Sequence, residues 1–377
     1  MNSSVTHVIV GAGHAAGCAV REMRSIGFGG RIVLIGAEPA LPYERPPLSK
    51  EVLLGAAALD DLLVNKAEFY SEQRVELRLA RTAVGVDTAD RVVRCDDGSF
   101  ISYDRLLIAT GSRPRRLENP GAHLSGVHYL RTLADAAVIQ SRLIFGNRMV
   151  VIGAGLIGLE VAAVARQRGM DVTVVEATSR SMCRVLPAPI ADVVTGRHRE
   201  HGVKFHFDCA VQEIGRTAGR LSVSCTARHL IADIVIVGIG VLPNTELAEE
   251  AGLALDNGIY VNEFCETSGA GAMAGRIVRL ESWQNAQDQA VAAAQAMCGR
   301  RVSYQPLPYN WSHQFDMNVQ IAGFPDAGTT VILRGSYRDD AFLSLYLKDA
   351  RVVGAVALNS PRDFRAVQHL IMRRTNV

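Results

Sequence analysis

The sequence lacks several features that would place it in a special class of protein. No run of about eighteen apolar residues is free of glycine and charge, so no membrane-spanning helix is expected. The net charge of +2 over 377 residues is too small for a nucleic-acid-binding protein. The N-terminus has no basic segment followed by an apolar run and a cleavage site, so we predict a cytoplasmic protein.

Cysteine pairs of the kinds that build functional sites are also missing. The seven cysteines are an odd number, are widely scattered, and form neither a CxxC nor a CxxxxC motif. This pattern argues against a disulfide framework, a zinc site or other metal site, and a paired-cysteine redox centre. We expect most of these thiols to fill the core. The cysteines are Cys18, Cys95, Cys183, Cys209, Cys225, Cys265 and Cys298.

What the sequence does have is a glycine-rich turn between a short apolar strand and a helix. Gly11 would allow a sharp turn, Gly13 a close approach of the backbone to a pyrophosphate, and the small Ala16 tight packing of helix on strand. The helix would then aim its positive N-terminus at the phosphates. Alone, the motif could be a plain tight turn, but its setting favours a nucleotide site. That setting is a strand at His7–Val10, a helix at Cys18–Ile26, a second strand at Arg31–Ile35 and the acid Glu38.

The same arrangement occurs a second time, which is the strongest indication of how the chain is organised. Here the full GxGxxG motif is present, and the acid stands 23 positions after its first glycine. That spacing is close to the one that brings a carboxylate to a ribose 2′-hydroxyl. Two such units predict two bound nucleotides. The second unit consists of a strand at Arg148–Ile152, the motif Gly153, Ala154, Gly155, Leu156, Ile157 and Gly158, a helix at Leu159–Arg168, a strand at Asp171–Val175 and Glu176.

Glu176 also predicts which nicotinamide nucleotide binds. A 2′-phosphate placed about 5 Å from a carboxylate would cost on the order of 3 kcal/mol per unit charge at an effective dielectric of about 20. This corresponds to more than roughly a hundredfold discrimination. Arg180 and Arg184 stand close by in the sequence and could weaken it, but we predict NADH rather than NADPH.

A proline-stiffened loop, Tyr43–Lys50, would deliver two cations near the first glycine turn. Arg45 could pair with a phosphate and Lys50 could lie beside a redox ring; a solvated loop is the simpler alternative. Glu160 lies in an otherwise apolar helical run, and an unpaired buried acid is costly, so it should have a cationic partner. Lys50 is the candidate partner, and a half-exposed helical glutamate is the alternative.

Two further buried strands end in small residues where a backbone can approach a nucleotide. Leu106–Gly111 ends in Thr110 and Gly111, and Ile234–Gly240 ends in glycines. We therefore include Thr110, Gly111 and Gly240, with Arg184, among the candidate cofactor-binding residues. The basic segment Arg113–Arg116 could be a solvated linker or part of a docking surface for an acidic partner.

These patterns predict an α/β fold with two Rossmann-like dinucleotide-binding domains and a small C-terminal α+β domain. With 48% apolar residues, the chain can bury a core large enough for such a division. We expect the first domain at 1–114 and 243–302, the second at 115–242 and the third at 303–377. The third would contain strands near Thr329–Leu333, Phe342–Leu347 and Val352–Ala357, closed by a helix at Pro361–Arg373.

Motifs along nearly the whole chain carry a family resemblance. The sequence resembles the FAD-dependent, NADH-linked ferredoxin reductases of the putidaredoxin reductase type, which serve Rieske-type dioxygenases and some cytochromes P450. Together these motifs are highly specific. They are VGAGHAAG, LPYERPPLSK, ATGSRPRRL, VIGAGLIGLEVA, VGIGVLPNTELAEEAGL, DNGIYVNE, RLESWQNA and WSHQF.

The resemblance implies cofactors, site residues and a partner. By that similarity the first glycine unit would hold FAD, the second would hold NADH, and Lys50 and Glu160 would pair close to the flavin as the catalytic residues. Hydride transfer to the flavin would be followed by two single-electron transfers to a small, acidic [2Fe–2S] ferredoxin. The C-terminal domain would help to form the ferredoxin-facing surface, in a monomer or a homodimer. FAD would be held through Ala15, Lys50, Ala83 and Arg131, with Trp283 and Trp311 beside its isoalloxazine ring.

The sequence departs from the family pattern at three places. Ala37 stands where the family has an acid, leaving Glu38 to serve the ribose, and His313 replaces the aspartate of WSDQ. The third departure follows Ser268, where roughly a dozen residues and a flavin-binding Ala-Gly-Asp are missing by comparison with the family.

This shortened segment leaves a second interpretation open. A degenerate relative could bind NADH or a partner with weak FAD or none. A flavin enzyme of another class, such as a disulfide reductase, is disfavoured because Pro39–Tyr43 contains no cysteine.

Overall fold

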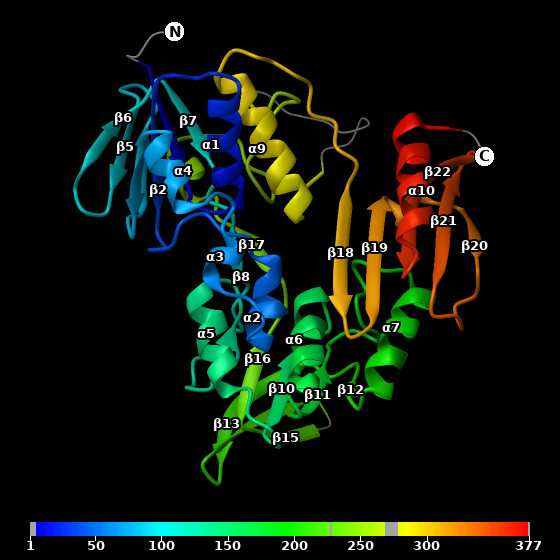
Figure 1. The fold of residues 1–377 in the computed structure, drawn as a ribbon. Coiled ribbons are helices and arrows are strands. Elements are labelled where there is room, and N and C mark those ends of the chain that lie inside the picture. The colour runs from blue at the N-terminus through cyan, green and yellow to red at the C-terminus, as the bar shows by residue number, and fades with distance from the viewer. Residues whose placement is uncertain (1–4, 227, 268–277, 376–377) are drawn as a thin grey trace. The chain divides into compact units, whose positions relative to one another are not determined.

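The computed structural model describes residues 5–226, 228–267 and 278–375, and Figure 1 shows their course. The chain divides into two compact units. The first unit comprises Met1–Arg45, Leu59–Arg113 and Leu242–Pro306, and the second comprises Pro46–Ala58, Pro114–Val241 and Leu307–Val377. Among the described residues, no helix is both long and apolar enough to cross a bilayer.

The first unit is built on a four-stranded parallel sheet in the order β3-β2-β1-β7, with a three-stranded antiparallel sheet β4-β5-β6. The apolar β1 and β2 are almost completely buried, as expected for parallel strands covered on both faces. The described elements are β1 (Thr6–Val10), α1 (His14–Ser25), β2 (Arg31–Gly36), α3 (Leu59–Leu62), α4 (Ala67–Glu72), β3 (Val75–Leu79), β4 (Ala83–Asp87), β5 (Val92–Cys95), β6 (Phe100–Ser102), β7 (Arg105–Ile108), α8 (Glu246–Glu250) and α9 (Trp283–Met297).

Helix α1 packs against α9, and the two lie side by side in Figure 1. Buried residues recur along α1 at helical spacing, as in Ala16, Ala19 and Met23, and small alanines of α9 share their core. Small residues on both helices let the two backbones approach closely. The start of α1 is thereby fixed at the carboxyl end of β1.

The second unit contains a five-stranded parallel sheet in the order β12-β11-β10-β16-β9, with an antiparallel sheet β13-β14-β15. Helix α6 follows β10 as α1 follows β1, so the predicted repeat is confirmed. The described elements are η1 (Pro46–Ser49), α2 (Glu51–Leu54), β9 (Val127–Tyr129), α5 (Leu133–Arg142), β10 (Arg148–Ile152), α6 (Leu156–Gln167), β11 (Asp171–Val175), α7 (Ala188–Glu200), β12 (Lys204–His206), β13 (Val211–Thr217), β14 (Arg220–Cys225), β15 (Arg228–Ala232) and β16 (Ile234–Val237). Two short strands, β8 (Ser112–Pro114) and β17 (Val241–Pro243), pair where the chain leaves and re-enters the first unit.

The C-terminal part of the second unit is a five-stranded antiparallel sheet in the order β18-β19-β22-β21-β20. Helix α10 packs on β22 and β19 through a buried face that includes Phe364 and Val367. The three strands and the closing helix expected here are confirmed. The elements are β18 (Tyr309–Gln314), β19 (Met317–Gly323), η2 (Pro325–Ala327), β20 (Thr330–Arg334), β21 (Phe342–Lys348), β22 (Arg351–Leu358) and α10 (Pro361–Arg373).

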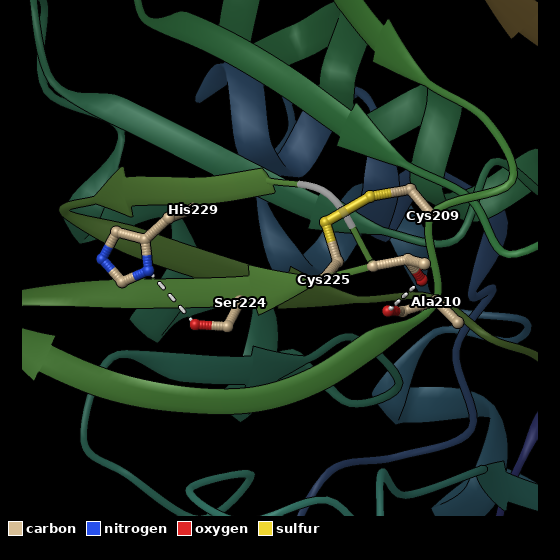
Figure 2. The surroundings of a disulfide bond; sticks show 6 residues. Cys209, Ala210, Ser224, Cys225 and His229 are labelled. Carbon is tan, nitrogen blue, oxygen red and sulfur yellow. Dashed lines mark hydrogen bonds between the residues drawn. A yellow bond between two sulfur atoms is a disulfide. The ribbon is translucent and has the colours of Figure 1, made fainter.

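One expectation about cysteine is wrong. Cys209 and Cys225 are joined by a disulfide, with their Cα atoms 5.6 Å apart (Figure 2). Cys225 ends β14 and Cys209 precedes β13, so antiparallel pairing of β13 with β14 brings the two residues together despite a separation of 16 positions. The wide spacing of the cysteines did not reveal this bond, because Cys209 and Cys225 meet only when β13 pairs with β14. The other five cysteines are free thiols, of which Cys18 and Cys95 are buried.

Candidate functional site

The first glycine turn has the geometry that a phosphate cradle requires. Gly11 has φ +108°, and a Cβ there would lie 2.1 Å from the carbonyl oxygen of Ala109, so no larger residue fits. A Cβ on Gly13 would meet nothing within 4 Å, which leaves open space beside the start of α1. Ala16 is fully buried and lets α1 pack on the sheet, while Ala15 is half-buried in the first turn. The predicted roles of these positions are compatible with this arrangement.

The acid after β2 is tied to the loop that follows it. Glu38 Oε1 accepts a hydrogen bond from Arg45 Nη2 at 2.7 Å, and Glu38 Oε2 accepts one from Tyr43 Oη at 2.6 Å. Two predicted cofactor residues, Glu38 and Arg45, are therefore adjacent. Arg45 pairs with the carboxylate in this structure, so its proposed contact with a phosphate stays a prediction.

The strand end at Thr110 and Gly111 is fixed by Asn244. Thr110 Oγ1 donates to the carbonyl oxygen of Asn244 at 2.6 Å, and Asn244 Nδ2 donates to the carbonyl oxygen of Thr110 at 2.9 Å. The backbone N–H of Asn244 also donates to the carbonyl oxygen of Gly111 at 2.9 Å. Sequence reasoning did not identify Asn244 as a site residue, although it lies in the VLPN part of a family motif.

His14 and Trp283 bring the start of α9 to the first glycine turn. The two rings stack with centroids 4.7 Å apart, and burial lowers the pKa of His14 to about 4, with a smaller contribution from Arg21. His14 is therefore neutral at pH 7 and adds no charge to the turn. Trp283 was predicted and His14 was missed. Ala83, also predicted, begins β4 of the same unit.

The second glycine turn repeats the close approaches of the first. Gly153 has φ +101°, and a Cβ there would lie 2.5 Å from the carbonyl oxygen of Gly238 in the segment after β16. A Cβ on Gly158 would lie 2.2 Å from the carbonyl oxygen of Gly153. Gly155 precedes Leu156 and the half-exposed Ile157, with which α6 begins. A side chain at Gly153 or Gly158 would therefore clash with the backbone, which explains why glycine is required at these two positions.

Glu176 closes the second turn. Its Oε2 accepts a hydrogen bond from the backbone N–H of Ala154 at 2.7 Å, and its Oε1 accepts two from the N–H and the hydroxyl of Thr178, each at 2.9 Å. Arg180 donates to the carbonyl oxygen of Leu186 at 2.8 Å. This contact turns the Arg180 guanidinium to backbone oxygens.

Arg184 lies against Gly240, another predicted site residue with φ +110°. A Cβ on Gly240 would be 3.4 Å from Arg184 Nη2, so the two candidate residues are neighbours.

The buried carboxylate of Glu160 is the centre of a polar cluster in the second unit. Its side chain is 3% exposed, and Lys50 Nζ lies 2.8 Å from its Oε2, so the predicted ion pair is confirmed. Ser49 also donates to Oε2, and Ser312 Oγ donates to Oε1 at 2.5 Å. Lys50 Nζ additionally donates to the carbonyl oxygen of Pro46 at 3.0 Å. The half-exposed alternative for Glu160 is wrong.

The remaining predicted contacts of FAD are distributed over both units. Arg131 lies just before α5, where its backbone N–H donates to Asp135 Oδ2 at 3.1 Å. Trp311 stacks on Tyr309 with centroids 5.6 Å apart. Trp311 belongs to the second unit and Trp283 to the first, so their common position beside a flavin stays a prediction. The shortened segment after Ser268 lies outside the described residues.

The fold and the two glycine turns agree with family models. Residues 5–290 match the pyridine nucleotide-disulphide oxidoreductase model, and residues 309–377 match the reductase C-terminal model. The chain belongs to the pyridine nucleotide-disulphide oxidoreductase family and carries its reductase C-terminal domain.

Named relatives span nearly the whole chain. Rhodocoxin reductase of Rhodococcus erythropolis is 40% identical over 97% of this chain and 88% of its own length. The anthranilate 1,2-dioxygenase system ferredoxin–NAD(+) reductase component of Burkholderia cepacia is 41% identical over 97% of this chain and 93% of its own. The reductase in the covalent putidaredoxin reductase–putidaredoxin complex superposes with a TM-score of 0.95 and 34% identity, over 100% of this chain and 95% of that one. None of these matches favours a degenerate relative.

Proposed function

We propose that this protein is an FAD-dependent reductase that passes electrons from NADH to a [2Fe–2S] ferredoxin, which in turn feeds an oxygenase. The observation that carries the proposal is the match to such reductase components along 97% of the chain. The two glycine turns and the buried ion pair of Lys50 and Glu160 support it.

The residues of the first unit fit FAD. The open space at Gly13 beside the start of α1 suits a pyrophosphate, which the helix N-terminus stabilises electrostatically. Glu38 keeps free lone pairs for ribose hydroxyls beside its bonds to Arg45 and Tyr43. When bound, FAD supplies a ring that accepts a hydride and releases electrons singly. Ala15, Ala83 and Trp283 of this unit stay predicted contacts, as does Arg131 of the second unit.

The second turn is proposed to hold NADH. Its glycines allow the dinucleotide to approach the backbone at the start of α6, and Glu176 retains acceptor capacity for the ribose hydroxyls. The negative charge of Glu176 disfavours a 2′-phosphate. The contact of Arg180 with Leu186 limits its ability to offset that charge.

Lys50 and Glu160 are proposed as the catalytic pair. The buried carboxylate of Glu160 accepts hydrogen bonds from three donors, and it fixes the Lys50 ammonium at 2.8 Å. The ammonium is a fixed positive charge that would stabilise the electron-rich product of hydride transfer. The carbonyl oxygen of Pro46, in the same loop, also orients the ammonium by accepting a hydrogen bond from Nζ at 3.0 Å.

The proposed electron acceptor is a ferredoxin. A putidaredoxin reductase has been captured with putidaredoxin, which supports a ferredoxin as acceptor. We propose an acidic [2Fe–2S] ferredoxin, a cytoplasmic location, and a monomer or homodimer. Two of the arginines considered for docking also make contacts within the chain. Arg113 forms an ion pair with Glu246 at 2.6 Å, and the guanidinium carbon of Arg116 lies 4.1 Å from the centroid of the Tyr129 ring.

The proposal is tested by NADH-driven reduction of a [2Fe–2S] ferredoxin, measured with and without added FAD. Rapid reduction of the ferredoxin that depends on bound FAD supports the function. A protein that binds NADH but passes no electrons, even after incubation with FAD, would sink it.

A further inference from the structure

A series of buried hydrogen bonds leads away from Glu160 through the interior of the second unit. We call this series the Glu160 network: Ser312 Oγ lies 2.5 Å from Glu160 Oε1, Gln314 Nε2 lies 2.9 Å from Ser312 Oγ, and His198 Nε2 lies 2.8 Å from Gln314 Oε1. The exposed fractions of these four residues are 3%, 0%, 1% and 0%. The network therefore connects the ion pair with a histidine on a different helix without reaching the surface.

Strand and helix periodicity place these side chains. On β18, Ser312 and Gln314 point to one face because side chains alternate, whereas His313 between them is exposed on the other. Helix α6, which carries Glu160, packs on β18. His198 is the last buried residue of α7 and continues the buried face of Val194 and Thr195.

The directions of the hydrogen bonds follow from the charge of Glu160. An ionised carboxylate only accepts, so Ser312 must donate its hydroxyl proton to it. The Ser312 oxygen then accepts from the amide of Gln314, and the amide oxygen of Gln314 accepts from His198. His198 must therefore carry its proton on Nε2. Each bond in the network donates toward Glu160.

The surroundings of His198 agree with a neutral ring. Its edge contacts Phe315 at 5.0 Å and Phe205 at 6.0 Å between centroids, and its Nδ1 has no hydrogen-bond partner among the described residues. Burial lowers its pKa to about 4, so the ring is uncharged at pH 7. Because Nδ1 has no partner among the described residues and Nε2 faces the amide oxygen of Gln314, the neutral tautomer that fits is the one protonated on Nε2.

We propose that Ser312, Gln314 and His198 are positioning residues for the Lys50–Glu160 pair, because their one-way series of donors orients the Glu160 carboxylate toward Lys50. The expected effect on the rate of flavin reduction rests on the proposed function, whereas the directions of the hydrogen bonds do not. Breaking the network leaves Oε1 without its donor, so the carboxylate can turn and Lys50 loses its fixed position.

The first arm of the test measures bleaching of the flavin by NADH under anaerobic stopped flow. Ser312→Ala is expected to slow bleaching by roughly three- to thirtyfold with an unchanged Kd for NADH, because the ammonium is misplaced. Ser344→Ala is the matched control, since Ser344 is also fully buried in the same sheet, and its side chain bonds to Tyr337, at 3.3 Å, and to Tyr346 rather than to the Glu160 network. His198→Asn should also slow bleaching. His198→Gln should bleach at close to the wild-type rate, because its amide N–H can replace the Nε2 donor.

The second arm reads the network directly and does not require flavin reduction. In protein with ¹⁵N-labelled histidine, His198 is identified by the signal that His198→Asn removes from the ten histidines. The wild type should show one tautomer, protonated on Nε2, at pH 7. Ser312→Ala should give a mixture of tautomers because Gln314 can then turn its amide, and Ser344→Ala should not.

Different results would contradict the role of the Glu160 network and the proposed function. A wild-type His198 protonated on Nδ1, or folded Ser312→Ala and His198→Asn proteins that bleach at the wild-type rate, would overturn the proposal. If Ser312→Ala does not fold, the His198→Asn and His198→Gln pair decides. A wild type that NADH does not bleach contradicts the proposed function instead, and the tautomer then decides whether the network exists.

Discussion

At the scale of single residues, two carboxylates have different tasks because their surroundings differ. Glu160 is buried and saturated by Lys50 and two serines, so its charge is used internally. Glu176 lies at the end of β11 and bonds to backbone and hydroxyl donors that leave its negative charge uncompensated. We therefore expect Glu176, and not Glu160, to select the nucleotide, whereas Glu160 forms the ion pair with Lys50.

Glu176→Gln should relax the preference for NADH over NADPH. The change keeps the side-chain oxygen for Ala154 but removes a charge worth on the order of 3 kcal/mol at about 5 Å, so the ratio of kcat/KM values should fall roughly ten- to a hundredfold. Steady-state kinetics with both nucleotides measure this ratio. Glu213→Gln, on an exposed position of β13, is the control and should leave it unchanged. A ratio that stays at the wild-type value in Glu176→Gln would show that Glu176 does not select the nucleotide.

At the scale of elements, each glycine turn lies against the end of a neighbouring strand in its sheet. Gly11 approaches Ala109 after β7, and Gly153 approaches Gly238 after β16. In both sheets the contact is at the carboxyl ends of the parallel strands, where the chain order reverses. The position of each proposed nucleotide thus follows from one strand–turn–helix element and its neighbouring strand.

Gly158→Ala should weaken NADH binding by about tenfold or more, equivalent to about 1.4 kcal/mol, because the new methyl group would displace the turn at Gly153. Titration calorimetry measures the Kd. Gly196→Ala is the matched control, since a Cβ on this residue of α7 meets nothing within 4 Å and alanine favours a helix. Equal affinities of the two variants would argue against a steric role for Gly158.

The disulfide predicts a thiol count. Denatured protein that was never exposed to a reductant should react with a thiol reagent at five cysteines, and reduced protein at all seven. Peptide mass spectrometry should find Cys209 linked to Cys225. Seven reactive thiols without reduction would show that the bond is absent in solution.

At the scale of the whole molecule, the sequence predicted what local order encodes. Both glycine turns, three of the strands of the C-terminal sheet and the pair of Lys50 with Glu160 could be predicted because each follows from spacing, or from the cost of an unpaired acid. The contacts of Ser312 with Glu160 and of His198 with Gln314 could not, since they join distant positions, 152 and 116 residues apart, and the uncharged Ser312 and Gln314 do not require a charged partner as a buried acid does. The division into three domains stays a prediction, because the structure separates two units and groups the C-terminal sheet with the second.

Buried histidines should make the folded state sensitive to acid. Burial lowers the pKa values of His7, His14 and His198 to about 4, so the unfolded chain takes up protons from about pH 6.5 downward and the folded chain does not. Stability is therefore full above about pH 6.5 and falls toward pH 4, by up to about 1.4 kcal/mol per pH unit for each histidine.

The thermal midpoint, measured by calorimetry from pH 7 to pH 5, should drop less steeply in His198→Gln than in the wild type. Parallel curves would mean that His198 is protonated to the same extent in both states. Exposed His313→Gln is the control and should follow the wild type.

The central claim is that one nucleotide is a resident flavin and the other an exchangeable hydride donor. The most direct measurement is the visible spectrum of the purified protein under anaerobic conditions, before and after addition of NADH. We predict flavin absorption bands that NADH bleaches within seconds and that a ferredoxin then restores. A colourless protein that added FAD does not reconstitute, or bound flavin that NADH leaves oxidised, would contradict the account.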